Sequence, residues 1–204
     1  MRYDWARWFK PLGTVTPVFN SLLQTGDYIT DLFSKVQGLL TWKATRSSIT
    51  AAVSGGASTV ADVNISSLTI TANQPAAGDR VLIKVMGTIT KPNAAGTTIT
   101  FWAKINGTSK IGSVTYTPTA GLTTVPFCFE CEVIFRTLGS SGTVWGQSTV
   151  NIQTAATTAI AYVGAGASTT INTTANMTIA AGFTFSNSNA SNNVTANIAV
   201  IDLE

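Results

Sequence analysis

Histidine is absent from this chain of 204 residues, and only two cysteines are present. The absence of histidine removes the commonest general base, the usual serine-histidine-aspartate triad and most zinc sites. Charged residues make up only 10 % of the chain, well below the share typical of soluble domains. No run of about 18 consecutive apolar residues occurs, so no membrane-spanning helix is expected. These absences argue against an enzyme and against a membrane protein.

The two cysteines, Cys128 and Cys131, have the CxxC spacing of metal and redox sites. They fall within an alternating stretch, where residues three apart point to opposite faces of a strand. The chain has no second cysteine pair and no histidine to complete a tetrahedral zinc shell. Cys131 falls in the apolar row, so we expect it to be a buried core residue, and we expect neither a metal nor a cofactor.

Two carboxylates, Glu130 and Glu132, are expected on one face of the same strand, about 7 Å apart. Paired carboxylates at such a distance occur in glycosidases. The alternative, which we favour, is a solvated sheet face whose charge is balanced by Lys84, Lys104 or Arg136. Since no other group in the chain suggests a reaction, we expect no catalytic residue.

The net charge of +3 comes entirely from the N-terminal segment. Residues 1–46 hold six basic and three acidic side chains, whereas residues 47–204 hold six of each sign. Nucleic-acid binding normally needs a dense basic stripe, so no nucleic-acid partner is expected. Because the pattern of residues 1–45 also differs from the rest, we predict an N-terminal segment at 1–45 and a β domain at 46–204.

Three aromatic rings lie within the five residues 5–9, close to basic side chains. Aromatic and arginine side chains are enriched at the cores of protein interfaces. We therefore predict a docking segment, and the alternative is that these rings cover the chain's own core. The predicted docking side chains here are Trp5, Arg7, Trp8 and Phe9.

Between residues 19 and 40 the apolar residues recur at heptad spacing, which is typical of a helix that packs along one side. Gly26 interrupts this pattern and Asp27 can cap a new helix, so we predict one amphipathic helix at about residues 27–40. It packs against the β domain or a neighbour, or it joins copies as a short coiled coil. The apolar stripe consists of Leu22, Ile29, Leu32, Phe33, Val36 and Leu39.

The remainder of the chain alternates apolar and polar residues with the period of two that marks half-buried strands. About eight to ten such runs are separated by turn signals, and no helical pattern comes between them. The pattern predicts a mainly β fold, an antiparallel β-sandwich of jelly-roll type. The longest run is residues 125–137, in which one face holds Phe127, Phe129, Cys131, Val133 and Phe135.

The stretch Gly78–Gly107 contains two alternating runs joined by Lys-Pro-Asn-Ala-Ala-Gly, and we predict that the two runs pair as a hairpin. Asn106-Gly107 predicts a second, tighter turn of the primed type. Three apolar residues, Leu82, Met86 and Trp102, fall on the outward side of the runs. One exposed patch of this kind would be costly in water, so we predict that it is an assembly surface.

Several motifs are similar to a recurring module of tailed-bacteriophage virion proteins. They are Gly78-Asp79-Arg80-Val81, Gly87-Thr88-Ile89-Thr90, the turn RTLGSSGTV at 136–144 and the C-terminal pattern NVTANIAVIDLE at 193–204. The resemblance covers residues 65–204 and leaves out residues 1–45. It implies a structural component of the virion with a jelly-roll-like domain that is often trimeric, and it supplies no catalytic residue.

Two functions are therefore expected. The first is a non-enzymatic capsid decoration or head-fibre subunit, a homotrimer in the virion whose residues 1–45 dock on the major capsid protein or another virion protein. It would be made in the host cytoplasm, since the N-terminus lacks the apolar run of a secretory signal. The alternative is a tail-fibre or baseplate adhesin whose exposed aromatic rings stack on a host glycan. The candidate rings are Trp102, Tyr116, Trp145 and Tyr162, for which we favour burial in a subunit interface.

Overall fold

The computed structural model describes residues 46–57, 61–90, 97–107, 109–117, 124–155, 158–164 and 166–204. The chain divides into two units after residue 44, and every described residue belongs to the second unit, Thr45–Glu204. The predicted docking segment and its helix at about 27–40 lie outside the described residues. Twelve strands occur in the described part, which confirms the predicted mainly β fold. That part contains no helix able to cross a membrane.

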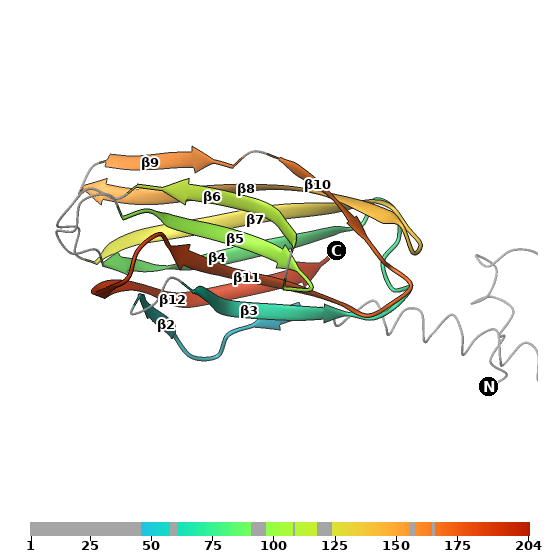
Figure 1. Ribbon diagram of the computed structural model, residues 1–204, viewed down its shortest axis with the longest axis horizontal. Coiled ribbons are helices and arrows are strands. Elements are labelled where there is room, and N and C mark those ends of the chain that lie inside the picture. Colours follow the sequence, from blue (N-terminus) through green and yellow to red (C-terminus); the bar gives the residue numbers. More distant parts are fainter. Residues whose placement is uncertain are drawn as a thin grey trace, which may run out of the picture. The chain divides into compact units, whose positions relative to one another are not determined.

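Two antiparallel sheets form the layers of a β-sandwich (Figure 1). The larger sheet has the order β1-β12-β4-β7-β8-β10, with β2 paired to β12 and β9 paired to β8. The smaller sheet has the order β3-β11-β5-β6. The strands of the larger sheet are β1 Arg46–Ser48, β2 Val53–Ala57, β4 Arg80–Thr90, β7 Val125–Thr137, β8 Gly142–Ala155, β9 Thr158–Val163, β10 Ala167–Ile171 and β12 Asn189–Leu203. Those of the smaller sheet are β3 Asp62–Ile70, β5 Ile99–Ile105, β6 Ser109–Tyr116 and β11 Met177–Phe185.

The core lies between the two sheets, because one side of most strands is apolar and turns inward. In β7 the five alternating residues predicted to share a face are all buried, from Phe127 to Phe135. The ring of Phe101 in β5 comes across from the smaller sheet and lies 4.8 Å from the ring of Phe127 and 5.8 Å from that of Phe129, between centroids. The inward faces thus interlock through aromatic rings, as the alternation predicts.

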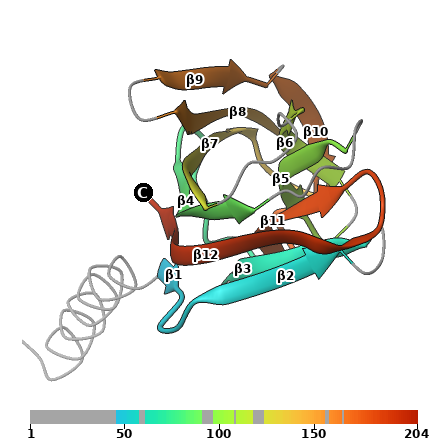
Figure 2. The ribbon, with the colours of Figure 1, turned by 90° about the vertical axis from the view of Figure 1, so that its left-hand side faces the viewer.

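The predicted hairpin within Gly78–Gly107 is wrong. Strand β4 pairs with β12 and β7, whereas β5 pairs with β11 and β6, so the two strands lie in different layers (Figure 2). Alternation indicates which side of a strand is buried, and it carries no information about the neighbouring strand. The turn at Asn106 and Gly107 is confirmed: both residues have positive φ, 49° and 74°, and the turn joins β5 to β6.

Two adjacent glycines, Gly55 and Gly56, lie inside a strand. Residues 53–57 form strand β2, which pairs with β12. A Cβ on Gly55 would lie 2.7 Å from side-chain atoms of both Phe183 and Val63. Glycine is therefore needed here for close packing against the smaller sheet rather than for a flexible loop.

Candidate functional site

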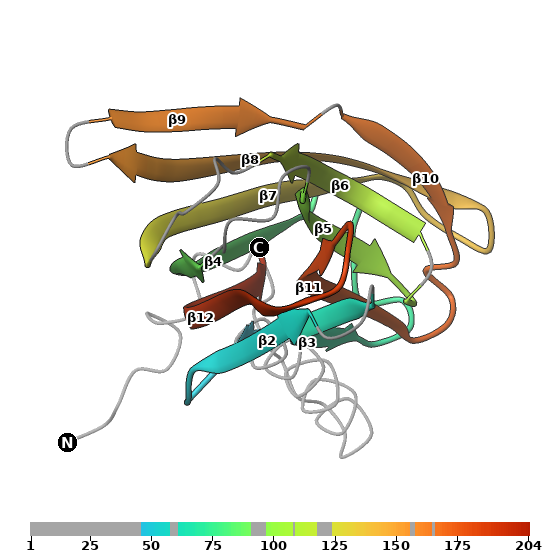
Figure 3. The same ribbon diagram turned by 60° about the vertical axis from the view of Figure 1, so that its left-hand side comes forward.

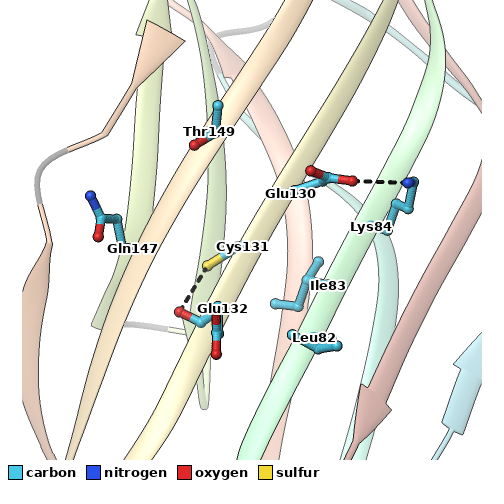
Figure 4. A pocket seen from close by; sticks show the side chains of 8 residues that line it. All are labelled: Leu82, Ile83, Lys84, Glu130, Cys131, Glu132, Gln147 and Thr149. Atoms are coloured by element: carbon cyan, nitrogen blue, oxygen red, sulfur yellow. Dashed lines mark hydrogen bonds and ion pairs between the residues drawn. The ribbon is translucent and has the colours of Figure 1, made fainter. Parts of the chain in front are cut away.

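The outward surface of the larger sheet, called the outer face below, contains a shallow hollow of about 510 Å³ (Figure 4). The hollow follows the register of three strands. Lys84 pairs with Glu130 and Glu130 with Thr149, while the next row holds Leu82, Glu132 and Gln147. Two rows of side chains from β4, β7 and β8 therefore line the hollow. The lining residues are Leu82, Ile83, Lys84, Glu130, Cys131, Glu132, Gln147 and Thr149.

The charges of the outer face are paired within the chain. Lys84 Nζ lies 2.9 Å from Glu130 Oε1, and the hydrogen bond and charge of Glu130 raise the pKa of Lys84, which stays protonated at neutral pH. Arg80 lies 3.7 Å from a carboxylate oxygen of Glu132 and 2.9 Å from one of Glu204. Each of these groups is about half exposed, so each pair adds little to stability. The pairs nevertheless leave this part of the outer face nearly neutral.

This arrangement confirms the prediction of a solvated, charge-balanced face in one part and corrects it in another. Lys84 is a counter-ion of Glu130, as predicted. The second counter-ion is Arg80 instead of Lys104 or Arg136, because Lys104 lies in the smaller sheet and Arg136 lies over an aromatic ring. Both carboxylates thus face cations in open solvent, which is a poor setting for a general acid.

The two cysteines point to opposite faces, as their spacing predicted. Cys131 is buried in the core, where burial and then the charge of Glu132 raise the pKa of its thiol to about 12. Cys128 is half-buried on the outer face, and burial followed by the charge of Glu130 raises its pKa. Both thiols are therefore protonated at neutral pH and are weak nucleophiles and weak metal ligands. Within the described ranges, no three acidic or cysteine side chains gather as a metal site would require.

Exposed apolar side chains accompany these ion pairs on the outer face. Met86 is 36 % exposed and Ile198 is 50 % exposed, and the two stand opposite each other in β4 and β12. Cys128 stands on the other side of Met86 in β7, so the three form one row across the sheet. Leu82, four residues along β4 on the same side, is half-buried. Leu82 and Met86 of the predicted assembly surface therefore share this face.

Ile198 was missed because a β-bulge changes the phase of β12. By simple alternation Ile198 would share the buried side of Val194 and Ala196. The register shifts between Ala196 and Ile198, so Ile198 turns outward and Ile201 takes up the core position. The one signal in the sequence is Gly87 on the neighbouring strand, where a Cβ would lie 1.9 Å from the backbone oxygen of Thr195. A lone glycine inside a strand often marks a bulge of this kind.

Trp102 lies in the smaller sheet and is only 2 % exposed. Its indole N–H donates a hydrogen bond of 2.9 Å to Thr184 Oγ1, and its ring covers Gly182. Lys104 Nζ lies 4.5 Å from the ring centroid and forms an ion pair with Asp62. Trp102 is therefore packed between a glycine and a lysine of its own chain.

The prediction that Leu82, Met86 and Trp102 form one surface is consequently wrong. Leu82 and Met86 point outward from the larger sheet, whereas Trp102 points outward from the smaller sheet, on the other side of the sandwich. The physical reason is again the pairing of β4 and β5 with different neighbours. Only the first two residues remain candidates for the outer face.

The aromatic residues considered for glycan stacking occupy different environments. Tyr116 is buried in the core, where desolvation raises the pKa of its hydroxyl, and its ring lies 5.1 Å from that of Tyr162. Trp145 is half-buried on the outer face, with the guanidinium carbon of Arg136 4.9 Å from its ring centroid. With Trp102 also buried, Trp145 is the candidate ring that the outer face presents.

The predicted N-terminal site residues lie outside the described part of the chain. They are Trp5, Arg7, Trp8, Phe9, Leu22, Ile29, Leu32, Phe33, Val36 and Leu39.

Comparison with known proteins gives no match to any family, to any curated protein or to any solved structure. The function is therefore argued from the β-sandwich, the outer face and the sequence motifs.

Proposed function

We propose that this protein is a non-enzymatic structural subunit of a tailed-phage particle, a capsid decoration or head-fibre subunit. In this proposal residues 1–45 dock on the major capsid protein or another virion protein, and three copies associate through their outer faces. The observation that carries it is the outer face itself, whose charges are paired internally while apolar side chains stay exposed. The sequence motifs resemble those of phage virion proteins, and this resemblance is the reason for proposing a phage particle.

The outer face has the composition that a contact between subunits needs. Interface cores are depleted of charged residues and enriched in apolar groups such as methionine, and the row of Cys128, Met86 and Ile198 fits this description. Here Lys84 and Glu130 neutralise each other, so a neighbouring subunit does not have to supply counter-ions. Burying the row that contains Met86 and Ile198 removes apolar area from water, which contributes about 25 cal/mol per Å². Nothing in the described part of the chain covers these two side chains, and the proposed assembly would supply this cover.

We further propose that the sandwich is of jelly-roll type, in which the chain winds repeatedly between two sheets. The support is the strand order. Strands β3, β4 and β5 alternate between the smaller and the larger sheet, and β11 and β12 do so again. In each sheet a strand from the C-terminal end of the chain, β11 or β12, lies between two strands from its first half. A homotrimer agrees with what the resemblance implies for such a domain.

The trimer can be tested by placing lysines at Met86 and Ile198 together. The two positions face each other in register, so a subunit contact would have to bury two unpaired like charges. We expect the mass from light scattering to fall threefold from that of the wild type, toward a single chain of 21.3 kDa. The matched control is Leu138→Lys at the β7–β8 turn, another exposed apolar residue, which should keep the wild-type mass. A double variant with the wild-type mass would refute the outer-face contact.

The alternative function, a tail-fibre or baseplate adhesin, is favoured by one observation, the partly exposed ring of Trp145 beside Arg136. An aromatic ring of this kind can stack on a sugar. Binding of the pure protein to host surface glycans, together with its loss in Trp145→Ala, would replace the structural proposal by this one.

A further inference from the structure

No charged residue occurs between Arg136 and Asp202. This neutral part of the sequence forms β8, β9, β10, β11 and most of β12. Three of these strands lie together, since β9 and β10 both pair with β8 at one edge of the larger sheet. One edge of the sheet is therefore built without any charged side chain.

Strand β9 lies outermost along one half of this edge and β10 along the other half (Figure 3). Among the described strands it pairs with β8 alone. Its sequence, TAIAYV, has no charge and no proline, and Ile160 is 38 % exposed and Val163 65 % exposed. An edge strand presents a row of backbone N–H and C=O groups that can pair with another strand. Strand β9 thus combines an open backbone edge with exposed apolar side chains.

Most of the other edge strands carry features that discourage such pairing. Strand β2, which pairs with β12 alone, has no charge either, but unlike β9 it exposes no large apolar side chain. Charged residues occur in β1, β3 and β6, at Arg46, Asp62 and Lys110. Strand β10 turns the polar side chains of Ser168 and Thr170 to solvent. Charged and polar side chains at edges are the usual protection of natural sheets against unwanted pairing. Strand β9 lacks this protection, which points to an edge that is covered in the working assembly.

We propose that β9 pairs antiparallel with β9 of a second copy of this chain, so that the larger sheet continues across a twofold axis. If a charged strand paired with this edge, its charges would find no counter-ions, because β9 is neutral. A second copy of β9 is neutral as well, so its pairing avoids this cost. Antiparallel pairing of identical strands is also self-complementary. With Ala161 on the axis, Ile160 stands opposite Tyr162. These two residues pair with the buried Ile152 and Val150 of β8, so apolar side chains on the inner side of the sheet meet each other across the axis.

This pairing does not depend on the proposed trimer, because it uses a different part of the sheet. A six-residue strand is about 20 Å long, which makes a contact smaller than a standard protein interface. The association should accordingly be reversible and depend on concentration. It would join single chains into dimers, and it would join trimers two by two when the three β9 edges of one trimer meet those of one other trimer.

The test is sedimentation of the full chain and of Ile160→Lys over a wide range of protein concentration. Lysine on the open edge should block pairing without unfolding the protein, since Ile160 is already partly exposed. We expect the wild-type mass at high concentration to be twice that of the variant, and the two to converge on dilution. If the protein proves not to be a trimer, the twofold difference in mass between wild type and variant is still expected. The two proposals are therefore tested separately. The control Leu138→Lys should behave as the wild type.

Hydrogen exchange gives a second readout that does not rely on a variant. The amides of residues 158–163 should exchange several-fold more slowly in concentrated than in dilute wild-type protein, and Ile160→Lys should remove this difference. Equal masses of wild type and Ile160→Lys at every concentration would overturn the proposal. An exchange rate of β9 that does not change with concentration would overturn it as well.

Discussion

Replacing Phe101 by alanine is expected to lower the free energy of unfolding by about 3–5 kcal/mol, the usual cost of removing a buried phenylalanine ring. Phe101 is fully buried and reaches from the smaller sheet to the rings of Phe127 and Phe129 in the larger one. The substitution leaves a cavity between the two layers, which the rigid sheets cannot close. Urea unfolding at one fixed, low protein concentration measures the effect, since association links stability to concentration.

The matched comparison is Ile134→Ala on the outer face. Ile134 is 37 % exposed, so its truncation should cost less than about 1 kcal/mol. If Phe101→Ala cost no more than Ile134→Ala, the two sheets would not be packed against each other as described.

Gly182→Ala is the second substitution for which we expect a large loss of stability, about 2–3 kcal/mol. A Cβ on Gly182 would lie 2.1 Å from the backbone oxygen of Val63 and 2.5 Å from the ring of Trp102. A change of rotamer can move the ring, but it cannot move the backbone of β3. The alanine therefore has to separate β11 from β3, and it also displaces Trp102 from its place between Gly182 and Lys104.

Gly107→Ala separates this steric effect from the general cost of replacing glycine. No atom lies within 4 Å of the position where its Cβ would be, and the only penalty is a positive φ of 74°. We expect the urea midpoint of Gly182→Ala to fall well below that of Gly107→Ala, and the near-ultraviolet signal of tryptophan to change in Gly182→Ala alone. A Gly182→Ala protein with the wild-type midpoint would contradict the close packing of Trp102 in the smaller sheet.

The individual strands could be predicted because their signal is local. In β7 the phenylalanines alternate with charged and polar residues, and burial of one side follows directly from the pleat. The turn between β5 and β6 was also local, since Asn106 and Gly107 tolerate positive φ better than other residues. Such features need only neighbours in the sequence.

The pairing of strands could not be predicted, because it depends on partners far apart in the chain. Strand β4 lies between β12, from the end of the chain, and β7, and nothing within Gly78–Gly107 indicates either neighbour. The nearest strand in sequence, β5, was the default partner and proved wrong. Chain order thus favoured a hairpin where the fold has a crossover between layers.

The same limit explains which parts of the candidate surface were missed. Trp102 was correctly placed on the outward side of its strand, but its cover comes from Lys104, whose ion-pair partner Asp62 is 42 residues away. Ile198 was missed because a bulge shifts β12 by one residue, and a one-residue shift turns the following side chains to the other face. Met86 could be predicted because β4 is regular around it.

The most direct test of the central claim is the number of copies bound to each emptied phage capsid, measured at saturation for the full chain and for a chain truncated to residues 46–204. The truncated chain must first show a cooperative unfolding transition, so that lost binding cannot be assigned to lost folding. The account predicts that the full chain fills a fixed number of sites and that the truncated chain fills none. Binding of the truncated chain at full occupancy would contradict it.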